Sequence, residues 1–395
     1  MKALILAAGR GTRVQPLTRS IPKPMLPILN KPVMETLIDL LRDHGVKQIV
    51  INTSYLSSEI ESYFRDGARF GVEIAYSFEG FLRGGRLQDE PLGSAGSIRR
   101  IQDHSGFFDE TFFVLCGDAL VDLDLTRMAA EHRRRGAIAS IALAEVDRQE
   151  VSSYGVVVTD RDGWIRDFQE KPAVADARSN LVNTGIYLFE PEVVNRIPRQ
   201  FPYDLGSKVF PALVAEGARF LGVQIPFEWL DIGKTTDYYR VVQLALSGKV
   251  PRLKPHGREI APGIWIGPNV RLETTVEMVP PVMIGGSCAI KASARIEGPC
   301  LVEAGCTVES GARVTRSLLM PYTRVGSHAN LEDAIACGRY CVKSDGTVLE
   351  IAPEDLGWVL SDARETLAEP AHVGELREML MALQAQSRRR PDGLS

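Results

Sequence analysis

Residues 264–320 read IWIGPNVRLETTVEMVPPVMIGGSCAIKASARIEGPCLVEAGCTVESGARVTRSLLM, and this stretch decides the fold of the second half of the chain. An apolar residue recurs there at every sixth position, ten times in succession. Because 45% of the chain is apolar, ten matches at one spacing arise by chance about three times in ten thousand. A six-residue period predicts a hexapeptide parallel β-helix. The positions are Ile266, Leu272, Met278, Ile284, Ile290, Ile296, Val302, Val308, Val314 and Met320.

A second apolar track lies two residues before the first and supports the same prediction. In residues 322–342 the rhythm stops, and we expect the coil to be capped there, because the exposed end of a solenoid must be covered. The second track comprises Ile264, Val270, Val276, Val282, Cys288, Ala294, Cys300, Cys306, Ala312 and Leu318.

The first part of the chain alternates short apolar runs with amphipathic helices, which predicts a Rossmann-like, mostly parallel α/β sheet. We expect an α/β domain over 1–248, a linker over 249–260, a left-handed parallel β-helix over 261–342 and a helical tail over 343–395. The tail carries one apolar stripe, which we expect to pack on the body or on a neighbouring subunit. Strands are expected over 2–7, 46–51, 112–116, 139–143, 183–189 and 220–224, and helices over 33–42, 57–65, 125–135, 208–217 and 236–246. The stripe is Val373, Leu376, Met379, Leu380 and Leu383.

Composition excludes several classes of partner. The formal net charge is −4 with no basic excess, so a nucleic-acid-binding surface is not indicated. No apolar run approaches the ~20 residues that cross a bilayer, and the opening apolar stretch is too short for a signal peptide. The six cysteines show no metal-like spacing, so zinc is not expected. We expect a cytoplasmic protein that binds neither nucleic acid nor membrane.

The stretch LAAGRGTRVQPLTRSIPKPMLPILNKP, residues 6–32, follows the first predicted strand. Gly9 and Gly11 let backbone N–H groups approach phosphate oxygens, and Arg13 and Lys23 add positive charge. The stretch has neither the third glycine of a dinucleotide fingerprint nor the ending of a P-loop. The alternative is a tight turn with surface charges, but ligands of open α/β sheets usually bind at such a junction.

This stretch resembles the signature of the sugar-1-phosphate nucleotidyltransferases, which runs GxGTR and later KPM-x-P. Further motifs resemble that family in the correct order: PLGSAGSI at 91–98, LCGDAL at 115–120, VSSYGVVV at 151–158, FQEKP at 168–172, NTGIYLF at 183–189 and EWLDIG at 228–233. The resemblance implies catalytic roles for Arg13, Lys23, Asp118 and Lys171. It implies nucleotide contacts from Leu6, Ala8, Gly9, Gly11, Thr12, Arg13, Gly93, Ala95 and Gly96, and sugar-phosphate contacts from Gly155, Glu170, Lys171 and Asn183.

The resemblance also implies that Asp118 and Asp231 bind Mg²⁺, an ion that takes few carboxylates together with phosphate oxygens. Three of the site residues implied by the resemblance also have a simpler structural explanation. Asp118 could be a turn residue, Gly155 could merely begin a strand, and the side chain of Asn183 could bond its own backbone. No general base is needed, because a sugar phosphate is already an anion at pH 7. We expect Lys23 near the α-phosphate, Lys171 on the sugar phosphate, and in-line attack that releases pyrophosphate.

The identity of the substrates is less strongly indicated. PLGSAG is similar to the PLGTAG of GDP-mannose pyrophosphorylases, but the longer segment GFLRGGRLQDEP at 80–91 resembles the cyanobacterial-type UDP-glucose pyrophosphorylases. We therefore expect UTP and glucose 1-phosphate, with mannose-1-phosphate guanylyltransferase activity as the alternative. A non-catalytic nucleotide-sugar-binding regulatory subunit is an alternative of another class, but it would be expected to lose Lys23, Asp118 or Asp231.

The β-helix itself is expected to be a scaffold. Acetyl transfer is disfavoured, because ten hexads make about three turns and His328 is the sole histidine of the region. The ends and flat faces of such a coil would be buried by association, so we expect a homo-oligomer.

Overall fold

The structure, a computed structural model, describes residues 1–250, 253–351 and 356–365, and the chain forms two compact units. The first comprises Met1–Thr12, Thr18–Leu26 and Lys31–Asp231; the second comprises Arg13–Leu17, Pro27–Asn30 and the described residues from Ile232 on. This division falls earlier in the chain than residue 248, and the domain limits stay a prediction.

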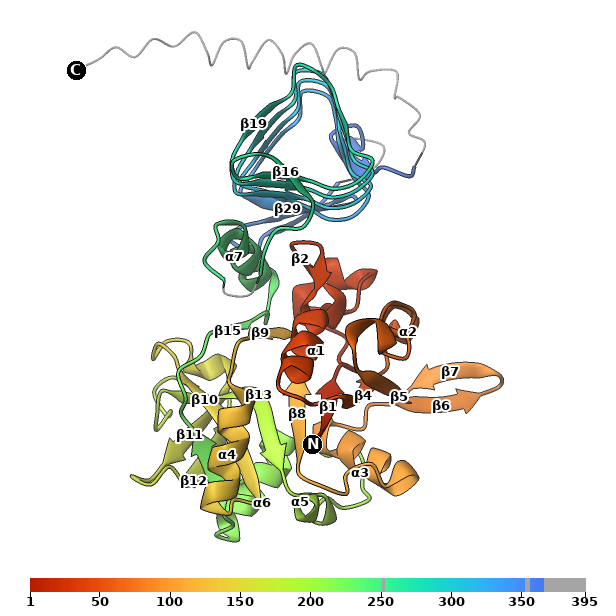
Figure 1. Cartoon of the computed structure of the whole chain (residues 1–395). Helices are drawn as coiled ribbons and strands as arrows, with labels where there is room; N and C mark the ends of the chain where they lie inside the picture. Colours follow the sequence, from red (N-terminus) through yellow and green to blue (C-terminus); the bar gives the residue numbers. More distant parts are fainter. Residues whose placement is uncertain (251–252, 352–355, 366–395) are drawn as a thin grey trace, which may run out of the picture. The chain divides into compact units, whose positions relative to one another are not determined.

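A nine-stranded sheet forms the centre of the first unit (Figure 1). Its strands β8, β1, β4 and β5 are parallel, with Leu4 paired to both Val50 and Val114, whereas β13, β11 and β12 add antiparallel pairs. The expected α/β sheet is therefore confirmed. In sheet order the strands are β12 (Ile165–Glu170), β11 (Gly155–Thr159), β13 (Leu181–Phe189), β8 (Phe112–Cys116), β1 (Lys2–Leu6), β4 (Gln48–Thr53) and β5 (Glu73–Phe78), with β10 (Ala139–Glu145) on β13 and β14 (Phe220–Val223) on β10.

Helices cover both faces of this sheet, and each face has its own apolar core. Successive residues of a strand point to opposite faces, so Ile5 packs with Ile38 and Ile60, while Leu4 packs with Ile98 and Phe210. The helices are α1 (Val33–Asp43), α2 (Ser57–Phe64), α3 (Ser94–Ser105), α4 (Leu125–Arg135), α5 (Pro191–Asn195) and α6 (Phe210–Ala215).

The helices predicted over 33–42, 57–65 and 125–135 are confirmed to within one residue at each end. The helix predicted over 208–217 begins as a π-helical turn, Leu205–Val209, before α6. Helix α3 was not predicted, because its first residues, SAGS, are small and form no apolar stripe of helical period.

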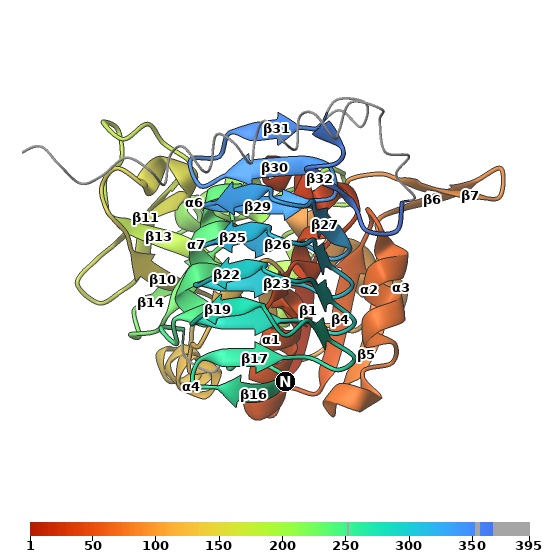
Figure 2. The same cartoon turned by 90° about the horizontal axis from the view of Figure 1, so that it is seen from above.

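Three sheets of short strands, parallel from one turn to the next, form a coil in the second unit (Figure 2). Ile264 pairs with Val282 and Val282 with Cys300, so one turn takes eighteen residues, or three hexads. Ile284 and Ile296 of the first track and Ala294 and Ala312 of the second are fully buried, so both tracks face the interior. The sheets comprise β16 (Arg258–Ala261), β17 (Ile264–Ile266), β20 (Val282–Ile284), β23 (Cys300–Val302), β26 (Leu318–Leu319), β29 (Ala334–Cys337), β30 (Tyr340–Lys343) and β31 (Val348–Glu350); β18 (Arg271–Leu272), β21 (Ala289–Ile290), β24 (Thr307–Val308), β27 (Thr323–Val325) and β32 (Leu360–Asp362); and β19 (Glu277–Val279), β22 (Arg295–Glu297), β25 (Arg313–Thr315) and β28 (Asn330–Glu332).

The repeat loses one residue in its last full turn, and the register predicted from the sequence is wrong there. Val302 pairs with Leu319, so Met320, the tenth member of the first track, is out of register. Three residues separate Glu297 from Leu301. Their pairing partners in the next turn, Thr315 and Leu318, are separated by only two. A fixed six-residue count cannot detect a corner that is shorter by one residue.

The coil also continues past residue 322, where the apolar rhythm was expected to stop. From Leu319 the six-residue spacing resumes through Val325 and Leu331, and β27, β28 and β29 pair in parallel with the turn before. The cap expected over 322–342 therefore begins only at β30, which is antiparallel to β29, and it includes β31 and β32.

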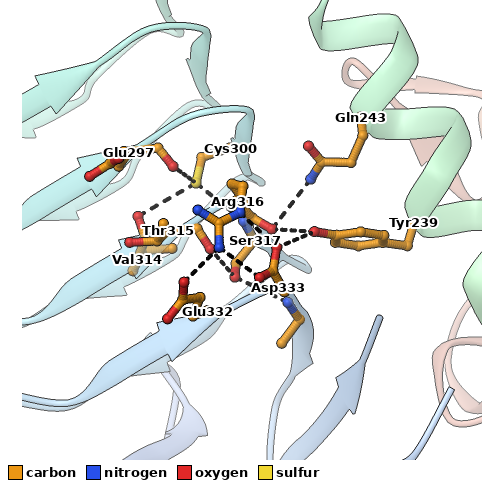
Figure 3. A network of polar contacts seen from close by, with 11 residues as sticks. Tyr239, Gln243, Glu297, Cys300, Val314, Thr315, Arg316, Ser317, Glu332 and Asp333 are labelled. Carbon is orange, nitrogen blue, oxygen red and sulfur yellow. Dashed lines mark hydrogen bonds and ion pairs between the residues drawn. The ribbon is translucent and has the colours of Figure 1, made fainter. Parts of the chain in front are cut away.

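Helix α7 (Thr235–Leu246) belongs to the second unit and contacts the shortened corner (Figure 3). Arg316 has a φ of +42° there, and its carbonyl oxygen accepts a hydrogen bond of 2.6 Å from Tyr239 Oη. Its guanidinium donates to both carboxylate oxygens of Asp333 at 2.8 and 2.7 Å, which holds the pKa of Asp333 below its usual range. The buried Tyr238 donates to the Pro27 carbonyl at 2.6 Å, so α7 also binds an N-terminal segment of the same unit.

Three further sequence predictions concern side chains and the tail. Cys288, Cys300 and Cys306, three members of the second apolar track, are fully buried inside the coil. No helix among the described residues combines the length and the apolar character needed to cross a membrane. The apolar stripe from Val373 to Leu383 lies outside the described residues.

Candidate active site

The glycine-rich loop after β1 and the Gly-Asp turn after β8 lie side by side at the carboxyl edge of the parallel strands. Leu6 pairs with Cys116, and the Gly117 N–H donates to the Leu6 carbonyl at 2.9 Å. A Cβ at position 117 would lie 3.0 Å from that oxygen, so glycine permits the close approach. Ligands of open α/β sheets bind at this edge.

Lys23 and Asp118 form an ion pair at this edge. Lys23 begins the 3-10 turn Lys23–Met25, in which Pro22 and Pro24 restrict the backbone on either side. The Nζ of Lys23 contacts Asp118 Oδ2, and the side chains are 10% and 30% exposed. The structure thus brings together two residues predicted to be catalytic.

Asp231 lies beside Asp118 through strand pairing. The short strand β15 (Trp229–Asp231) is antiparallel to β9 (Ala119–Val121), and Asp231 stands opposite Ala119. Burial, reinforced by the charges of Asp118 and Asp231, raises the pKa of the Cys116 thiol above its ordinary value. The two aspartates predicted to bind metal therefore lie close together.

These carboxylates fit a divalent ion that is shared with a ligand. The described residues contain no cluster of three or more His, Cys, Asp or Glu side chains that would enclose a metal by itself. Asp118 and Asp231 would supply two oxygen ligands, and phosphate or water oxygens would complete the coordination, as Mg²⁺ prefers.

The two loop glycines have different surroundings. Gly11 has a φ of +61°, and a Cβ there would lie 3.0 Å from Lys23 Cβ and 3.1 Å from Thr18 Cγ2. Thr18 Oγ1 also donates to the Gly11 carbonyl at 2.8 Å. Gly9 is exposed, with no atom within 4 Å of a Cβ built on it. Gly11 therefore shapes the loop, whereas space at Gly9 is left for a ligand.

Two arginines follow these glycines. Arg10 donates to Asp89 from Nε at 3.1 Å, which lowers the pKa of Asp89. Arg13 is exposed in the turn Thr12–Val14 and falls in the second unit, so its catalytic role stays a prediction. The same holds for the predicted nucleotide contacts of Leu6, Ala8 and Thr12.

Gly155 and Glu170 pair across β11 and β12. A Cβ on Gly155 would lie 2.7 Å from the Phe168 ring and 3.3 Å from Glu170 Oε2, and one on Gly206 would lie 2.5 Å from the same oxygen. The Glu170 carboxylate thus sits between two glycines, which supports more than a strand-opening role for Gly155.

Lys171 has a φ of +45° and its side chain is 53% exposed. The side chain of Asn183 is engaged locally: Oδ1 accepts from the Gly185 N–H at 2.9 Å and Nδ2 donates to Tyr187 Oη at 3.0 Å. This is the local bonding that the sequence left open as an alternative. Sugar-phosphate contacts by Lys171 and Asn183 stay predictions.

The predicted base-binding segment packs on residues 201–204. The Ala95 and Gly96 N–H groups donate to the Tyr203 carbonyl at 3.0 and 2.9 Å. A Cβ on Gly93 would lie 2.6 Å from the same carbonyl oxygen, and one on Gly96 would lie 2.8 Å from the Phe201 ring. The small residues are therefore explained by packing, and their contact with a nucleobase stays a prediction.

Two buried polar residues near the loop were not predicted. Asn52 is the penultimate residue of β4 and follows the apolar run at 49–51, and Glu79 directly follows β5. The Ala7 N–H donates to Asn52 Oδ1 at 2.6 Å, and Asn52 Nδ2 donates to Glu79 Oε1 at 2.6 Å. The only signal in the sequence was a polar residue at the end of an apolar run.

Comparisons with known proteins agree with this geometry. The profile of the family described as Nucleotidyl transferase matches residues 2–248. A UTP–glucose-1-phosphate uridylyltransferase of Synechocystis is 50% identical over 93% of this chain and 95% of its own length. A mannose-1-phosphate guanylyltransferase catalytic subunit beta of Xenopus tropicalis is 34% identical over 70% of this chain and 73% of its own length. A solved UDP-glucose pyrophosphorylase in complex with UDP-glucose is 25% identical, with a TM-score of 0.54 over 62% of this chain and 98% of that one.

Proposed function

Because this chain belongs to the nucleotidyl transferase family, we propose that it transfers a nucleotidyl group from a nucleoside triphosphate to a hexose 1-phosphate and releases pyrophosphate. The observation that carries the choice of substrates is the 50% identity to the Synechocystis uridylyltransferase over nearly the whole chain. UTP and glucose 1-phosphate are accordingly the substrates, and UDP-glucose is the product. GTP and mannose 1-phosphate are the second candidate pair, since guanylyltransferase relatives are 34% identical over 70% of the chain.

Alignment and neutralisation of charge carry the reaction. An oxygen of the sugar phosphate attacks the α-phosphorus in line, and pyrophosphate leaves with the electrons of the broken P–O bond. Lys23, held rigidly between two prolines, neutralises charge at the α-phosphate, and Arg13 acts on the outer phosphates. Lys171 holds the sugar phosphate beside Glu170, whose carboxylate lies 3.9 Å from Lys171 Nζ.

Asp118 and Asp231 would hold Mg²⁺ in this proposal. The ion, when bound, supplies positive charge that offsets the charge of the triphosphate. Lys23 contacts Asp118 directly and is itself 8% exposed, so this pair orients the carboxylate and keeps the lysine at the site.

A non-catalytic regulatory subunit is disfavoured. Such a protein has no need of a lysine and two aspartates at one edge of the sheet, yet all three residues are present and Lys23 and Asp118 are in contact.

The test is an assay of pyrophosphate release over a grid of nucleoside triphosphates and hexose 1-phosphates, with Mg²⁺ present. We expect the highest kcat/KM for UTP with glucose 1-phosphate. A higher value for GTP with mannose 1-phosphate would replace the first substrate pair by the second. No release from any pair would reject the reaction.

The second unit is proposed to join copies of the chain into a homo-oligomer in the cytoplasm. Strands β16 and β31 form the two edges of the eight-stranded sheet, and Ile260, Val348 and Leu349 on them are exposed. Unpaired edges with apolar side chains favour association. Light scattering after size exclusion should give a mass of at least twice 43.4 kDa.

A further inference from the structure

A buried chain of hydrogen bonds runs from the glycine-rich loop to the predicted base-binding segment. It starts at the Ala7 N–H, which donates to Asn52 Oδ1 at 2.6 Å, and continues from Asn52 Nδ2 to Glu79 Oε1 at 2.6 Å. Glu79 then accepts from Ser97 Oγ through Oε1, and from the Leu92 N–H at 3.2 Å through Oε2. Asn52, Glu79 and Ser97 are 2%, 6% and 1% exposed, so water does not compete for these bonds.

Glu79 is stabilised by neutral donors. Among the described residues no lysine or arginine forms an ion pair with it, and its oxygens are satisfied by an amide, a hydroxyl and a backbone N–H. Burying a carboxylate costs free energy unless its oxygens are hydrogen-bonded, so the positions of all three donors are tightly constrained. Ser97 also lies in the first turns of α3, where a helix favours negative charge.

Glu79 also anchors the hairpin formed by β6 (Gly80–Arg83) and β7 (Arg86–Asp89), which projects from the first unit in Figure 1. The Glu90 N–H donates to the Glu79 carbonyl at 3.1 Å, so both ends of the insertion meet at one point. The chain therefore returns from the hairpin directly to Glu79, whose side chain binds the Leu92 N–H. Asp89 of the hairpin in turn pairs with Arg10 of the glycine-rich loop.

We propose that Glu79 is a positioning residue for the nucleoside triphosphate. Through Asn52 and Leu92 it fixes the glycine-rich loop and the segment 92–97 relative to each other, so the triphosphate and the base meet preformed contacts. This inference takes only one point from the proposed function, namely that the ligand is a nucleoside triphosphate.

The direction of each hydrogen bond makes the proposal testable. In Glu79→Gln one carboxylate oxygen becomes an NH₂ group, which must face either the Leu92 N–H or the Asn52 NH₂. Either orientation sets a donor against a donor. Turning the Asn52 amide to relieve this conflict would break its bond with Ala7 and release the loop.

A second substitution should restore the chain with reversed polarity. In the double variant Asn52→Asp, Glu79→Gln, the new NH₂ group can donate to the carboxylate at position 52, which still accepts from Ala7. Ser97 Oγ can then accept, because it also has the Gly93 carbonyl as an acceptor at 2.9 Å. The double variant keeps the wild-type net charge.

The experiment compares Glu79→Gln, Asn52→Asp and the double variant with a matched control. Gln48 and Glu73 form a similar amide–carboxylate pair, at 3.2 Å, at the other end of the same two strands, and this pair is exposed. The control is therefore Glu73→Gln. We measure KM for each substrate, the Kd of UTP and of GTP by calorimetry, and thermal unfolding.

We expect Glu79→Gln to raise KM and Kd for the nucleotide by about tenfold or more, with KM for hexose 1-phosphate within about twofold. The double variant should recover most of this loss, and Glu73→Gln should match the wild type. An unchanged nucleotide Kd in Glu79→Gln, or a double variant no better than the single ones, overturns the inference. If Glu79→Gln does not fold, a folded double variant with near-wild-type Kd supports it and an unfolded or weakly binding one rejects it. If the wild type releases no pyrophosphate, the proposed function fails while the nucleotide Kd still decides this inference.

Discussion

Replacing Gly11 by alanine should disturb the packing of the glycine-rich loop on Lys23, the lysine predicted to be catalytic. Gly11 has a φ of +61°, a conformation that costs an alanine about 1–2 kcal/mol. Its new Cβ would also lie 3.0 Å from Lys23 Cβ, an atom next to the backbone that cannot turn away. Together these effects should lower the free energy of unfolding by about 1–3 kcal/mol and the Tm by roughly 2–10 °C.

Gly9→Ala is the matched control, two residues earlier in the same loop. Nothing lies within 4 Å of a Cβ there and the backbone is not left-handed, so the Tm should stay within about 1 °C of the wild type. If phosphates approach this loop, the added methyl group should still raise KM for the triphosphate by about tenfold.

Thermal unfolding followed by circular dichroism and initial rates of pyrophosphate release separate the two variants. For Gly11→Ala we expect a lower Tm together with a kcat reduced by about tenfold or more, because Lys23 is displaced from Asp118. Equal Tm values for both variants, with wild-type kcat for Gly11→Ala, would refute the steric argument.

Four other substitutions test the site and the coil. Lys23→Ala and Asp118→Asn should each lower kcat by about a hundredfold or more, measured by pyrophosphate release with circular dichroism as the folding control, and near-wild-type turnover in either would contradict the assignment. Burial, with a smaller contribution from Cys288, raises the pKa of Glu303 from 4.5 to about 8, so the folded state keeps a proton that the unfolded chain loses. Stability should therefore fall by on the order of 4 kcal/mol as pH rises from 4.5 to 8, and Glu303→Gln should remove this slope in urea titrations. The lowered pKa of Asp333 stabilises the fold above the unfolded value of 3.8 and is lost as pH falls through the folded value, so Asp333→Asn should flatten the acid limb of thermal unfolding.

The coil could be predicted from the sequence because its period is a direct consequence of its geometry. Each hexad forms one side of the triangle, so inward residues such as Ile284 and Ile290 recur at a fixed count. The shortened corner at Arg316 could not be predicted, because a count of apolar residues still finds Leu318 and Met320 near their expected places. The strand pairing, such as that of Val302 with Leu319, reveals the shift.

The site was predictable where function depends on residue type within a short motif. Lys23, Asp118 and Asp231 are charged residues in Pro-Lys-Pro, Gly-Asp and Leu-Asp contexts, and the structure brings them to one edge of the sheet. Asn52 and Glu79 were not predicted, because their role depends on which strands are neighbours. A polar residue at the end of an apolar strand has many possible partners until the fold is known.

The two units are interleaved along the chain: Arg13–Leu17 and Pro27–Asn30 belong with the residues after Asp231, and Tyr238 bonds the Pro27 carbonyl. A chimaera made by a single crossover near residue 231 would therefore combine these N-terminal segments from one parent with the rest of the second unit, including Tyr238, from another. Successful exchange would require three coordinated replacements in the gene.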